Sequence, residues 1–383
     1  MQYSKLVMAA AIALASASAA WADIKVGVVL SETGPAASLG IPEKKTVELF
    51  PKEIAGQKID YIFMNDGSDP TAAVKATKKL IDEDKVDVVI GSSITPNSLA
   101  MVDVVGGAKV PNISLAAGRN IVFPVEGNRT WVFNTPQTTG LMARAVVKNM
   151  VQNKIKTAAY IGFDDAYGQD WFKNFAEECK AAGIELVADE RYNRTATSVT
   201  GQALHILSAK PQAVLIGASG TPAVLPERTL KQVGYKGQIY QTHGVANPDF
   251  LRVCGADCNG TILPVSPGVV AAQLPADSPI KQSAMRYADA YEKAYGKNQL
   301  SQFSANAWDA GTLLEHAIPV ALKSAQPDNV VAFRAALRDA LEGLKNIAGA
   351  DGIYNMSPTD HNGLDDRAVA MVRIENGTWK LLK

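Results

Sequence analysis

The chain has 383 residues, of which 47% are hydrophobic, 20% charged and 7% aromatic, with 38 Lys and Arg against 38 Asp and Glu. This composition is typical of a globular protein and excludes a disordered or disulfide-rich chain. At about 150 residues per domain, the length predicts two or three domains. Because the formal net charge is zero, no basic field attracts a nucleic-acid backbone, and nucleic acid is not an expected partner.

Residues 1–22 have the features of a secretory signal peptide. Lys5 gives a positive start, residues 6–15 form an apolar run that is short for a membrane span, and small residues stand at 20–22. We expect cleavage before Asp23 and export to the periplasm. The alternative is an uncleaved membrane anchor, but nothing after residue 15 extends the apolar run. No cysteine stands at the cleavage site, so no lipid anchor is expected there.

From Asp23 onward, short apolar runs alternate with amphipathic ones, which is the pattern of strands and helices in a parallel sheet. Pro42 sets the start of the helix after the first strand. Asp69 followed by Pro70 indicates another helix N-terminus, because aspartate is a good N-cap and proline suits the first helical position. Strands are predicted at 24–30, 58–64, 86–90 and 110–115.

The alternation restarts after residue 137 and predicts a second array. Residues 280–343 are mostly helical in pattern, and the tail at 368–382 alternates like a closing β element. Two such arrays in one chain predict two lobes. In the second array we expect helices at 141–152, 168–182 and 199–209 and one ending at 233, with strands at 157–161, 184–188, 213–216 and 238–241.

The cysteines predict one disulfide. Cys254 and Cys258 stand four apart in a loop that contains glycine, and in an exported protein this spacing favours a small disulfide. A metal site would need two further ligands, and none of the four histidines stands at ligand spacing from the pair. Cys179 is expected to be a buried thiol. We expect neither a structural metal nor a cofactor.

Two loops follow predicted strands at positions where ligands bind in open α/β sheets. Beyond the carboxyl ends of strands, helix N-termini present free N–H groups and a partial positive charge. Ser92, Ser93 and Thr95 follow one buried strand and would suit a carboxylate; the alternative is a serine-rich helix cap without a ligand. Ala116 and Gly118 follow the next strand and leave the backbone open, as a plain turn also would.

No catalytic motif stands out. The stretch from Gly217 to Thr221 lacks the Gly-x-Ser-x-Gly elbow of serine hydrolases, because Thr221 stands where glycine is required. Neither the Gly-x4-Gly-Lys phosphate loop nor a Gly-x-Gly-x-x-Gly after the first strand is present. We therefore do not expect an enzyme, and an exported hydrolase or sensor domain is the alternative from a different class.

Four motifs, each loose but specific in their order, run along the chain. They are the strand at 24–29 leading to Ser31-Glu32-Thr33-Gly34-Pro35, the loop Ile90-Gly91-Ser92-Ser93, the run from Phe163 to Gln169, and Gly244-Val245-Ala246-Asn247. With these motifs the chain resembles the periplasmic solute-binding proteins of the branched-chain amino-acid (Leu/Ile/Val-binding) type, which are the binding components of ABC importers. The resemblance covers essentially the whole mature chain.

The resemblance implies a type I periplasmic-binding fold, in which two Rossmann-like lobes are joined by three crossovers and close on a ligand in a central cleft. The closed form would dock on a membrane permease, and we expect a monomer. We expect lobe I at 23–136 plus 265–353 and lobe II at 137–264 plus 354–383. The crossovers are expected near 134–139, 263–267 and 352–357.

The resemblance also implies site residues. The serine loop, here Ser92 and Ser93, holds the ligand's carboxylate together with Ala116 and Gly118 of the next loop. Tyr167 covers the ligand from the second lobe. The family anchors the ligand's α-ammonium with a glutamate just before the Gly-Val-Ala-Asn stretch, and here His243 occupies that position.

This departure changes the expected ligand. A neutral imidazole accepts only one hydrogen bond and a protonated one repels an ammonium, so an α-amino acid would bury an unpaired charge. Small residues at Gly118 and around Gly220 and Thr221 leave space for a larger ligand. We expect a benzoate-like or cinnamate-like carboxylate, with His243 donating to one of its oxygens, between apolar walls formed by Leu39, Tyr167 and Phe303.

Plain alternatives stay open for these residues. His243 could be a structural histidine below the cleft, Tyr167 a surface aromatic at a helix start, and Phe303 a core residue. The alternative function within the same class is a receptor for branched-chain or other aliphatic amino acids or amides.

Overall fold

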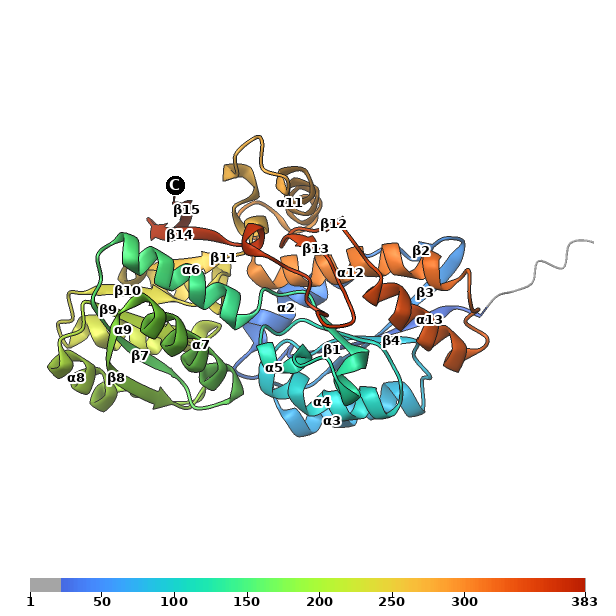
Figure 1. Cartoon of the computed structure of the whole chain (residues 1–383), viewed down its shortest axis with the longest axis horizontal. Helices are drawn as coiled ribbons and strands as arrows, with labels where there is room; N and C mark the ends of the chain where they lie inside the picture. Colours follow the sequence, from blue (N-terminus) through green and yellow to red (C-terminus); the bar gives the residue numbers. More distant parts are fainter. Residues whose placement is uncertain (1–21, 383) are drawn as a thin grey trace, which may run out of the picture.

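The structure, a computed structural model, describes residues 22–382 (Figure 1). Its strands form two large sheets flanked by helices. We call each sheet with its helices a lobe, and the two lobes lie side by side along the long axis of Figure 1. The predicted α/β class with parallel sheets is confirmed. The predicted signal peptide lies, except for residue 22, outside the described residues.

The first sheet has six strands in the order β2-β3-β1-β4-β5-β6, and all neighbours are parallel except the pair β2 and β3. Its strands are β1 (Ile24–Leu30), β2 (Glu53–Ile54), β3 (Gln57–Asn65), β4 (Val88–Gly91), β5 (Asn112–Ser114) and β6 (Val132–Asn134). The helices that accompany it are α2 (Ala37–Val47), α3 (Pro70–Asp82), α4 (Thr95–Gly107), α5 (Arg119–Val122), α11 (Lys281–Tyr295), α12 (Gln302–Ala321) and α13 (Val330–Glu342).

The second sheet has seven strands in the order β15-β14-β11-β10-β9-β7-β8, with β14 antiparallel to both of its neighbours. Its strands are β7 (Thr157–Phe163), β8 (Glu185–Tyr192), β9 (Ala213–Gly217), β10 (Gln238–Gln241), β11 (Ile262–Val265), β14 (Ala370–Glu375) and β15 (Thr378–Leu381). Its helices are α6 (Thr139–Gln152), α7 (Ala166–Ala182), α8 (Thr200–Ala209), α9 (Val224–Gln232) and α10 (Pro248–Cys254). A separate hairpin joins β12 (Ile347–Ala348) to β13 (Ile353–Tyr354).

Helices cover both faces of the first sheet, which explains why its central strands β1 and β4 are nearly continuous apolar runs. Successive side chains of β1 point to opposite faces. Val26 and Val28 pack in a core with residues of α12 and α13, whereas Val29 packs in a second core with Leu80 of α3 and Met101 of α4. The first lobe is therefore a three-layer structure with a core on each side of the sheet.

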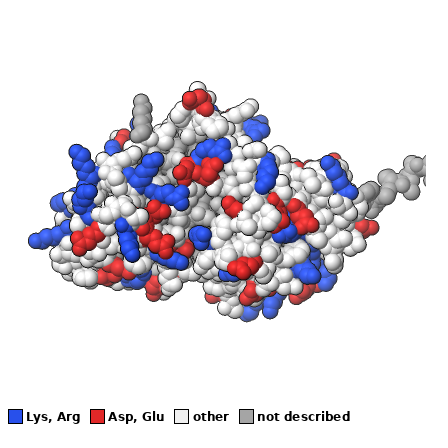
Figure 2. Space-filling model, viewed as in Figure 1, with Lys and Arg blue, Asp and Glu red and all other residues white. Residues whose placement is uncertain are grey.

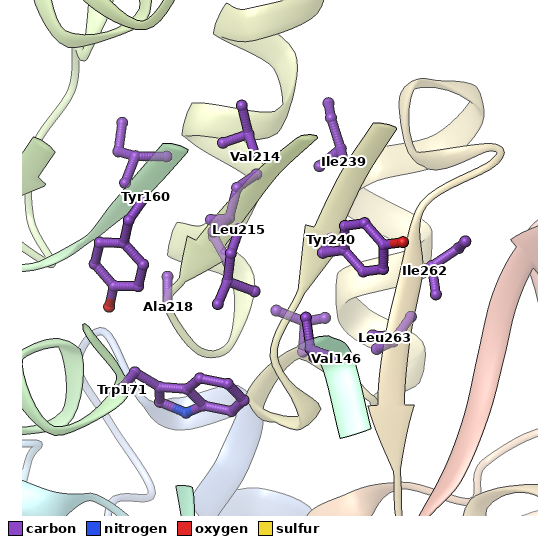
Figure 3. Close-up of a cluster of buried hydrophobic side chains, with 14 of the residues drawn as sticks. Val146, Tyr160, Trp171, Val214, Leu215, Ala218, Ile239, Tyr240, Ile262 and Leu263 are labelled. Atoms are coloured by element: carbon purple, nitrogen blue, oxygen red, sulfur yellow. The ribbon is translucent and has the colours of Figure 1, made fainter. Parts of the chain in front are cut away.

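Large aromatic side chains fill the core of the second lobe (Figure 3). Trp171 from α7, Tyr160 from β7 and Tyr240 from β10 are fully buried. The Tyr160 hydroxyl donates to the carbonyl oxygen of Gly168 at 2.7 Å. A Cβ atom at Gly217 would lie 1.8 Å from that hydroxyl oxygen, so Gly217 leaves the space that the tyrosine ring occupies.

Pro42 does not set the start of its helix, which is a correction to the sequence prediction. α2 begins at Ala37, and Pro42 lies inside it. Proline lacks an N–H group, so within a helix it removes one i to i−4 hydrogen bond. The hydrogen bond that is lost is the one that the carbonyl of Ser38, near the start of α2, would accept from residue 42. The helix continues beyond Pro42 to Val47. The predicted N-terminus at Asp69 is confirmed, because the Asp69 side chain accepts a hydrogen bond from the Ala72 amide with Pro70 at the first position.

Cys254 and Cys258 are joined by a disulfide, with their Cα atoms 5.8 Å apart, and Cys179 is a buried free thiol.

On the face drawn in Figure 2, acidic and basic side chains are interspersed, as the balanced charge of the chain leads one to expect. Within residues 22–382, no helix is both long enough and apolar enough to cross a membrane.

A buried hydrogen-bond network joins the three segments that pass between the lobes. Gln302, at the start of α12, accepts a hydrogen bond from the Ser266 amide at 2.7 Å and donates to Gln137 Oε1 at 2.9 Å. Gln137 in turn donates to the carbonyl oxygens of Asp351 at 3.2 Å and Ala368 at 2.8 Å. Two amide side chains therefore connect all three passages.

The third passage lies later in the chain than the sequence suggested. Tyr354 and Met356 are buried in the core of the first lobe, and the ring of His361 stacks on Phe133 with centroids 4.1 Å apart. The segment up to Leu364 thus packs on the first lobe, and the crossover expected near 352–357 falls between Leu364 and β14. The remaining lobe boundaries stay a prediction.

The packing around Tyr160 predicts the effect of adding one methyl group. Gly217→Ala should destabilise the protein by about 1–3 kcal/mol or more, because its Cβ would overlap the buried tyrosine. The matched control is Gly201→Ala in α8, where nothing lies within 4 Å of the new Cβ and helix propensity predicts stabilisation by about 0.5–1 kcal/mol. Urea unfolding of both variants measures the difference. Equal stabilities would contradict this account of the core.

Candidate functional site

The carboxyl ends of both parallel sheets meet at a cleft between the lobes. The cleft is nearly closed, with only about 20 Å³ open to the centre of a water molecule, which is room for about one or two waters. A ring of benzoate size therefore enters only when the lobes separate or the walls move. The lining side chains come from both lobes: Leu39, Ser93, Ile94, Thr95, Leu115, Ala116, Ala117, Phe303 and Asn306 from the first, and Tyr167, Arg194, Ser219, His243 and Gly244 from the second.

The structure brings together some of the residues predicted for the site and leaves others outside the lining. The loops after β4, β5, β7 and β10 each contribute at least one of the predicted residues, whereas the two predicted in the loop after β9 stay outside the lining. Leu39, Ser93, Ala116, Tyr167, His243 and Phe303 line the cleft, whereas Ser92, Gly118, Gly220 and Thr221 do not.

The four residues outside the lining have other roles. Ser92 Oγ donates to Asp66 Oδ2 at 2.5 Å, so it supports the loop from behind. A Cβ at Gly118 would lie 2.4 Å from Thr95 Cγ2, and one at Gly220 would lie 2.9 Å from Leu39 Cδ1. These glycines therefore allow close packing, Gly220 across the two lobes. Thr221 begins the short helix Thr221–Ala223.

Two buried acids stand behind the serine loop. Asp66 accepts hydrogen bonds from Ser31 Oγ at 2.7 Å and from the Ser68 amide at 2.9 Å, in addition to the bond from Ser92. Glu43 of α2 is hydrogen-bonded through Oε2 to the Ser93 hydroxyl. Burial raises the pKa of Glu43 well above its usual value, and the nearby charge of Asp66 acts in the same direction.

Thr95 presents a free hydroxyl to the cleft. It is the first residue of α4, its side chain is buried, and Oγ1 has no hydrogen-bond partner among residues 22–382. The first N–H groups of a helix also lack partners within the helix. Pro96, the second residue of α4, has no N–H, and the Ser98 amide donates to the Ile94 carbonyl at 3.0 Å. The start of α4 can therefore offer an anion the Thr95 hydroxyl and the backbone N–H groups of Thr95 and Asn97.

His243 lies in the cleft as a neutral imidazole. It belongs to the short helix His243–Val245 after β10, it is buried, and its ring lies 5.7 Å from that of Trp171. Burial lowers the pKa of His243 to about 3. Nδ1 has no hydrogen-bond partner within the described chain. Nδ1 of the uncharged imidazole can therefore form one hydrogen bond with a ligand, as donor or as acceptor depending on the tautomer.

Arg194 is the charged cleft residue that the sequence analysis missed, and the other lining residues that it did not predict for the site include Ile94, Ser219 and Asn306. It follows β8, and its guanidinium donates through Nε to Asp165 Oδ2 at 2.5 Å and through Nη1 to Ser219 Oγ at 3.0 Å. The guanidinium also lies over the ring of Phe163, 4.1 Å from its centroid. These contacts hold the group rigidly at the wall. The sequence did contain one indication of this residue: the run Arg191-Tyr192-Asn193-Arg194 stands at the end of a strand, where ligand-binding residues are expected.

The lining carries no acidic side chain. Its only formally charged member is Arg194, and the other polar members are hydroxyl, amide and imidazole groups. Among residues 22–382 there is also no group of three or more His, Cys, Asp or Glu side chains that could hold a metal ion. The lining thus offers a guanidinium that is already ion-paired with Asp165, together with hydroxyl, amide and imidazole groups that can form hydrogen bonds with a ligand.

Comparisons with known proteins identify a family model and several similar proteins. The profile described as periplasmic binding protein matches residues 23–378. An extracellular ligand-binding receptor from Rhodopseudomonas palustris HaA2 is 43% identical, with a TM-score of 0.91 over 94% of this chain and 100% of that chain. Leu/Ile/Val-binding protein homolog 3 from Brucella melitensis is 26% identical over 364 residues, 92% of each chain.

A solute-binding protein of an ABC transporter from R. palustris, solved in complex with benzoate, is similar in fold, at 23% identity and a TM-score of 0.79 over 94% of this chain and 96% of that chain. The predicted family resemblance and the predicted fold are confirmed by the profile match and by these structures. The chain belongs to the periplasmic binding protein family.

Proposed function

We propose that this protein captures a small organic acid, an aromatic carboxylate of the benzoate or cinnamate kind, by closure of its lobes and delivers it to the membrane permease of an ABC importer. The observation that carries the proposal is the charge of the cleft lining, in which Arg194 is a cation, His243 is neutral and no side chain is acidic. An anion gains charge-assisted hydrogen bonds from such a lining.

The same lining disfavours an α-amino acid. The ligand's ammonium would need a carboxylate or several acceptors, and the nearby acids are already engaged: Asp66 by three donors, Glu43 by Ser93 and Asp165 by Arg194. A buried ammonium without a partner loses more in desolvation than it regains. The relatives named as Leu/Ile/Val-binding proteins keep the amino-acid receptor as the alternative.

Apolar side chains favour a flat ring. Leu39 and Phe303 form a small cluster with Ala36 and Ile94 at the first-lobe wall, and Tyr167 stands on the other lobe. The Tyr167 hydroxyl donates to Thr242 Oγ1 at 3.0 Å, which fixes the orientation of its ring. A solute-binding protein of the same fold is known in complex with benzoate, and another with 3,4-dihydroxybenzoic acid. We place the ligand's ring between these walls, with its carboxylate at Thr95 and Ser93 and a second polar group facing Arg194 and His243.

Export by the N-terminal segment and the absence of catalysis are parts of the same proposal. A receptor that delivers its ligand to a permease works outside the cytoplasmic membrane, and its family is periplasmic. It binds and releases without changing the ligand. Steady turnover of an ester substrate would instead support the hydrolase alternative.

A panel of ligands tests the proposal by thermal unfolding. Benzoate, 4-hydroxybenzoate and cinnamate should raise the melting temperature of the mature protein, because a ligand that binds only the folded state stabilises it. Leucine and valine should leave it unchanged. Stabilisation by leucine without any effect of the aromatic acids would overturn the ligand assignment and support the amino-acid receptor.

Replacement of the cleft cation should weaken binding. Arg194→Gln removes the charge and should lower the affinity for an acid that carries a second polar group, such as 4-hydroxybenzoate, roughly 10- to 100-fold, the range expected for hydrogen bonds to a charged group. Benzoate has no second polar group, so its affinity should fall less. Arg228→Gln is the control, because Arg228 pairs with Asp257 on the surface of the same lobe. Calorimetric titration measures both. An unchanged dissociation constant in Arg194→Gln would remove this residue from the site.

His243 should govern which class of ligand is accepted. His243→Glu supplies the missing negative anchor, so it should weaken aromatic acids and permit some binding of leucine. His243→Gln stays neutral and should keep the preference for the acid. Because the pKa of the imidazole is about 3, wild-type affinity should show no histidine titration between about pH 5 and 8. If His243→Glu leaves the ranking of ligands unchanged, His243 does not contact the ligand.

A further inference from the structure

The buried carboxyl of Glu43 has a position that the proposed function does not explain. It lies in α2 directly behind Ser93, it is fully buried, and it does not line the cleft. Its Oε2 is hydrogen-bonded to the Ser93 hydroxyl, whereas Oε1 has no partner among residues 22–382. An ionised carboxylate with one donor is an unfavourable thing to bury.

Asp66, which follows β3 in the same lobe, is a buried carboxylate whose charge is stabilised by hydrogen bonds. Three donors reach its two oxygens: the hydroxyls of Ser31 and Ser92 and the amide of Ser68. Within residues 22–382, no cationic side chain offsets the charge that an ionised Glu43 would carry. The adjacent Lys44 turns away to Glu32, at 2.7 Å. Asp66 is the charged group whose field reaches Glu43, and it opposes ionisation. Of these two acids, Glu43 is the one whose environment favours the neutral form.

Whether Glu43 carries a proton decides whether the Ser93 hydroxyl donates or accepts a hydrogen bond at the cleft. A hydroxyl has two acceptor positions and one hydrogen to donate. Ser93 Oγ already accepts the Ser31 amide hydrogen at 3.0 Å. If Glu43 donates to the second position, both acceptor positions are filled, and the Ser93 hydrogen is left for the cleft that Ser93 lines. If Glu43 is ionised, the Ser93 hydrogen is used on Glu43, and a lone pair faces the cleft instead.

We propose that Glu43 is a positioning residue for ligand binding: it keeps a proton in its hydrogen bond to Ser93 and so turns the Ser93 hydroxyl into a donor toward the ligand's carboxylate. This role rests on the proposed function only in requiring a ligand with a carboxylate. It also gives the first lobe a donor pair, Ser93 with the unpartnered hydroxyl of Thr95, on a wall without a cation. If Glu43 were ionised, the Ser93 hydroxyl would donate to Glu43 instead of to the ligand, and the negative charge of Glu43 would repel the ligand's carboxylate.

Substitution of Glu43 tests the role through rescue. In Glu43→Gln the side-chain amide N–H donates to Ser93 as the protonated acid does, so affinity should stay within about threefold of wild type. Glu43→Ala and Ser93→Ala should each weaken binding roughly 10-fold, as expected for loss of a hydrogen bond to a charged group. Adding Glu43→Ala to Ser93→Ala should cause no further loss, because one acts through the other.

Glu227→Gln is the matched control. Glu227 is equally buried, but it lies in the second lobe, bonded to Thr261 and Gln241, so its substitution should not change affinity. Melting temperatures separate unfolding from loss of binding. If Glu43→Gln binds as weakly as Ser93→Ala while its melting temperature matches that of wild type, the carboxylate charge is required and the proposal is wrong.

The proton itself can be observed without any ligand. The infrared difference spectrum of wild type minus Glu43→Gln at neutral pH should contain the carbonyl band of a protonated carboxyl. Carboxylate bands in its place would overturn the proposal. The binding arm uses benzoate, cinnamate and leucine in parallel. Binding of leucine alone would defeat the proposed ligand class, while the same variants, measured with leucine, would still test Glu43.

Discussion

Burial of polar groups between two closing lobes is the constraint on which the site depends. Once the strand ends of both sheets face each other, water has little access, and each hydroxyl, imidazole or charged group there needs a partner from the protein or from the ligand. Ser92 and Asp66 satisfy each other within the protein. Thr95 and His243 keep unpartnered atoms. These two atoms, a hydroxyl and an imidazole nitrogen, are therefore available to a ligand.

The second lobe meets this constraint with one fixed cation. Arg194 is held by Asp165, by Ser219 and by the ring of Phe163, so its guanidinium does not have to be ordered when a ligand arrives. The first lobe offers hydroxyls and the start of α4 instead. The two walls therefore differ in kind: one has a placed charge and the other has placed donors. A ligand with two polar ends separated by a ring matches this difference.

Much of the fold was predictable because local patterns and tertiary structure agree. The strands at 24–30 and 238–241 and the helix after Asp69 follow from apolar runs and capping chemistry. The predictions failed where distant residues decide. Pro42 is tolerated inside α2, and the segment up to Leu364 packs on the first lobe through Tyr354, which no local pattern indicates.

The site was predictable in outline for a similar reason. Strand-end loops can be located from the sequence, so Ser93, Ala116 and His243 were found. Which of the two adjacent serines lines the cleft depends on the partner behind each, and these partners, Glu43 and Asp66, are far from the serines in sequence. Arg194 was missed because the contacts that turn it into the cleft come from other elements. Its function lies in that placement.

The amide network of Gln302 and Gln137 has a mechanical consequence. Because these two side chains tie the three linkers together, no linker can bend alone without breaking a buried bond. The network therefore couples the three linkers, so a change in the angle between the lobes would have to be accommodated by all three of them together.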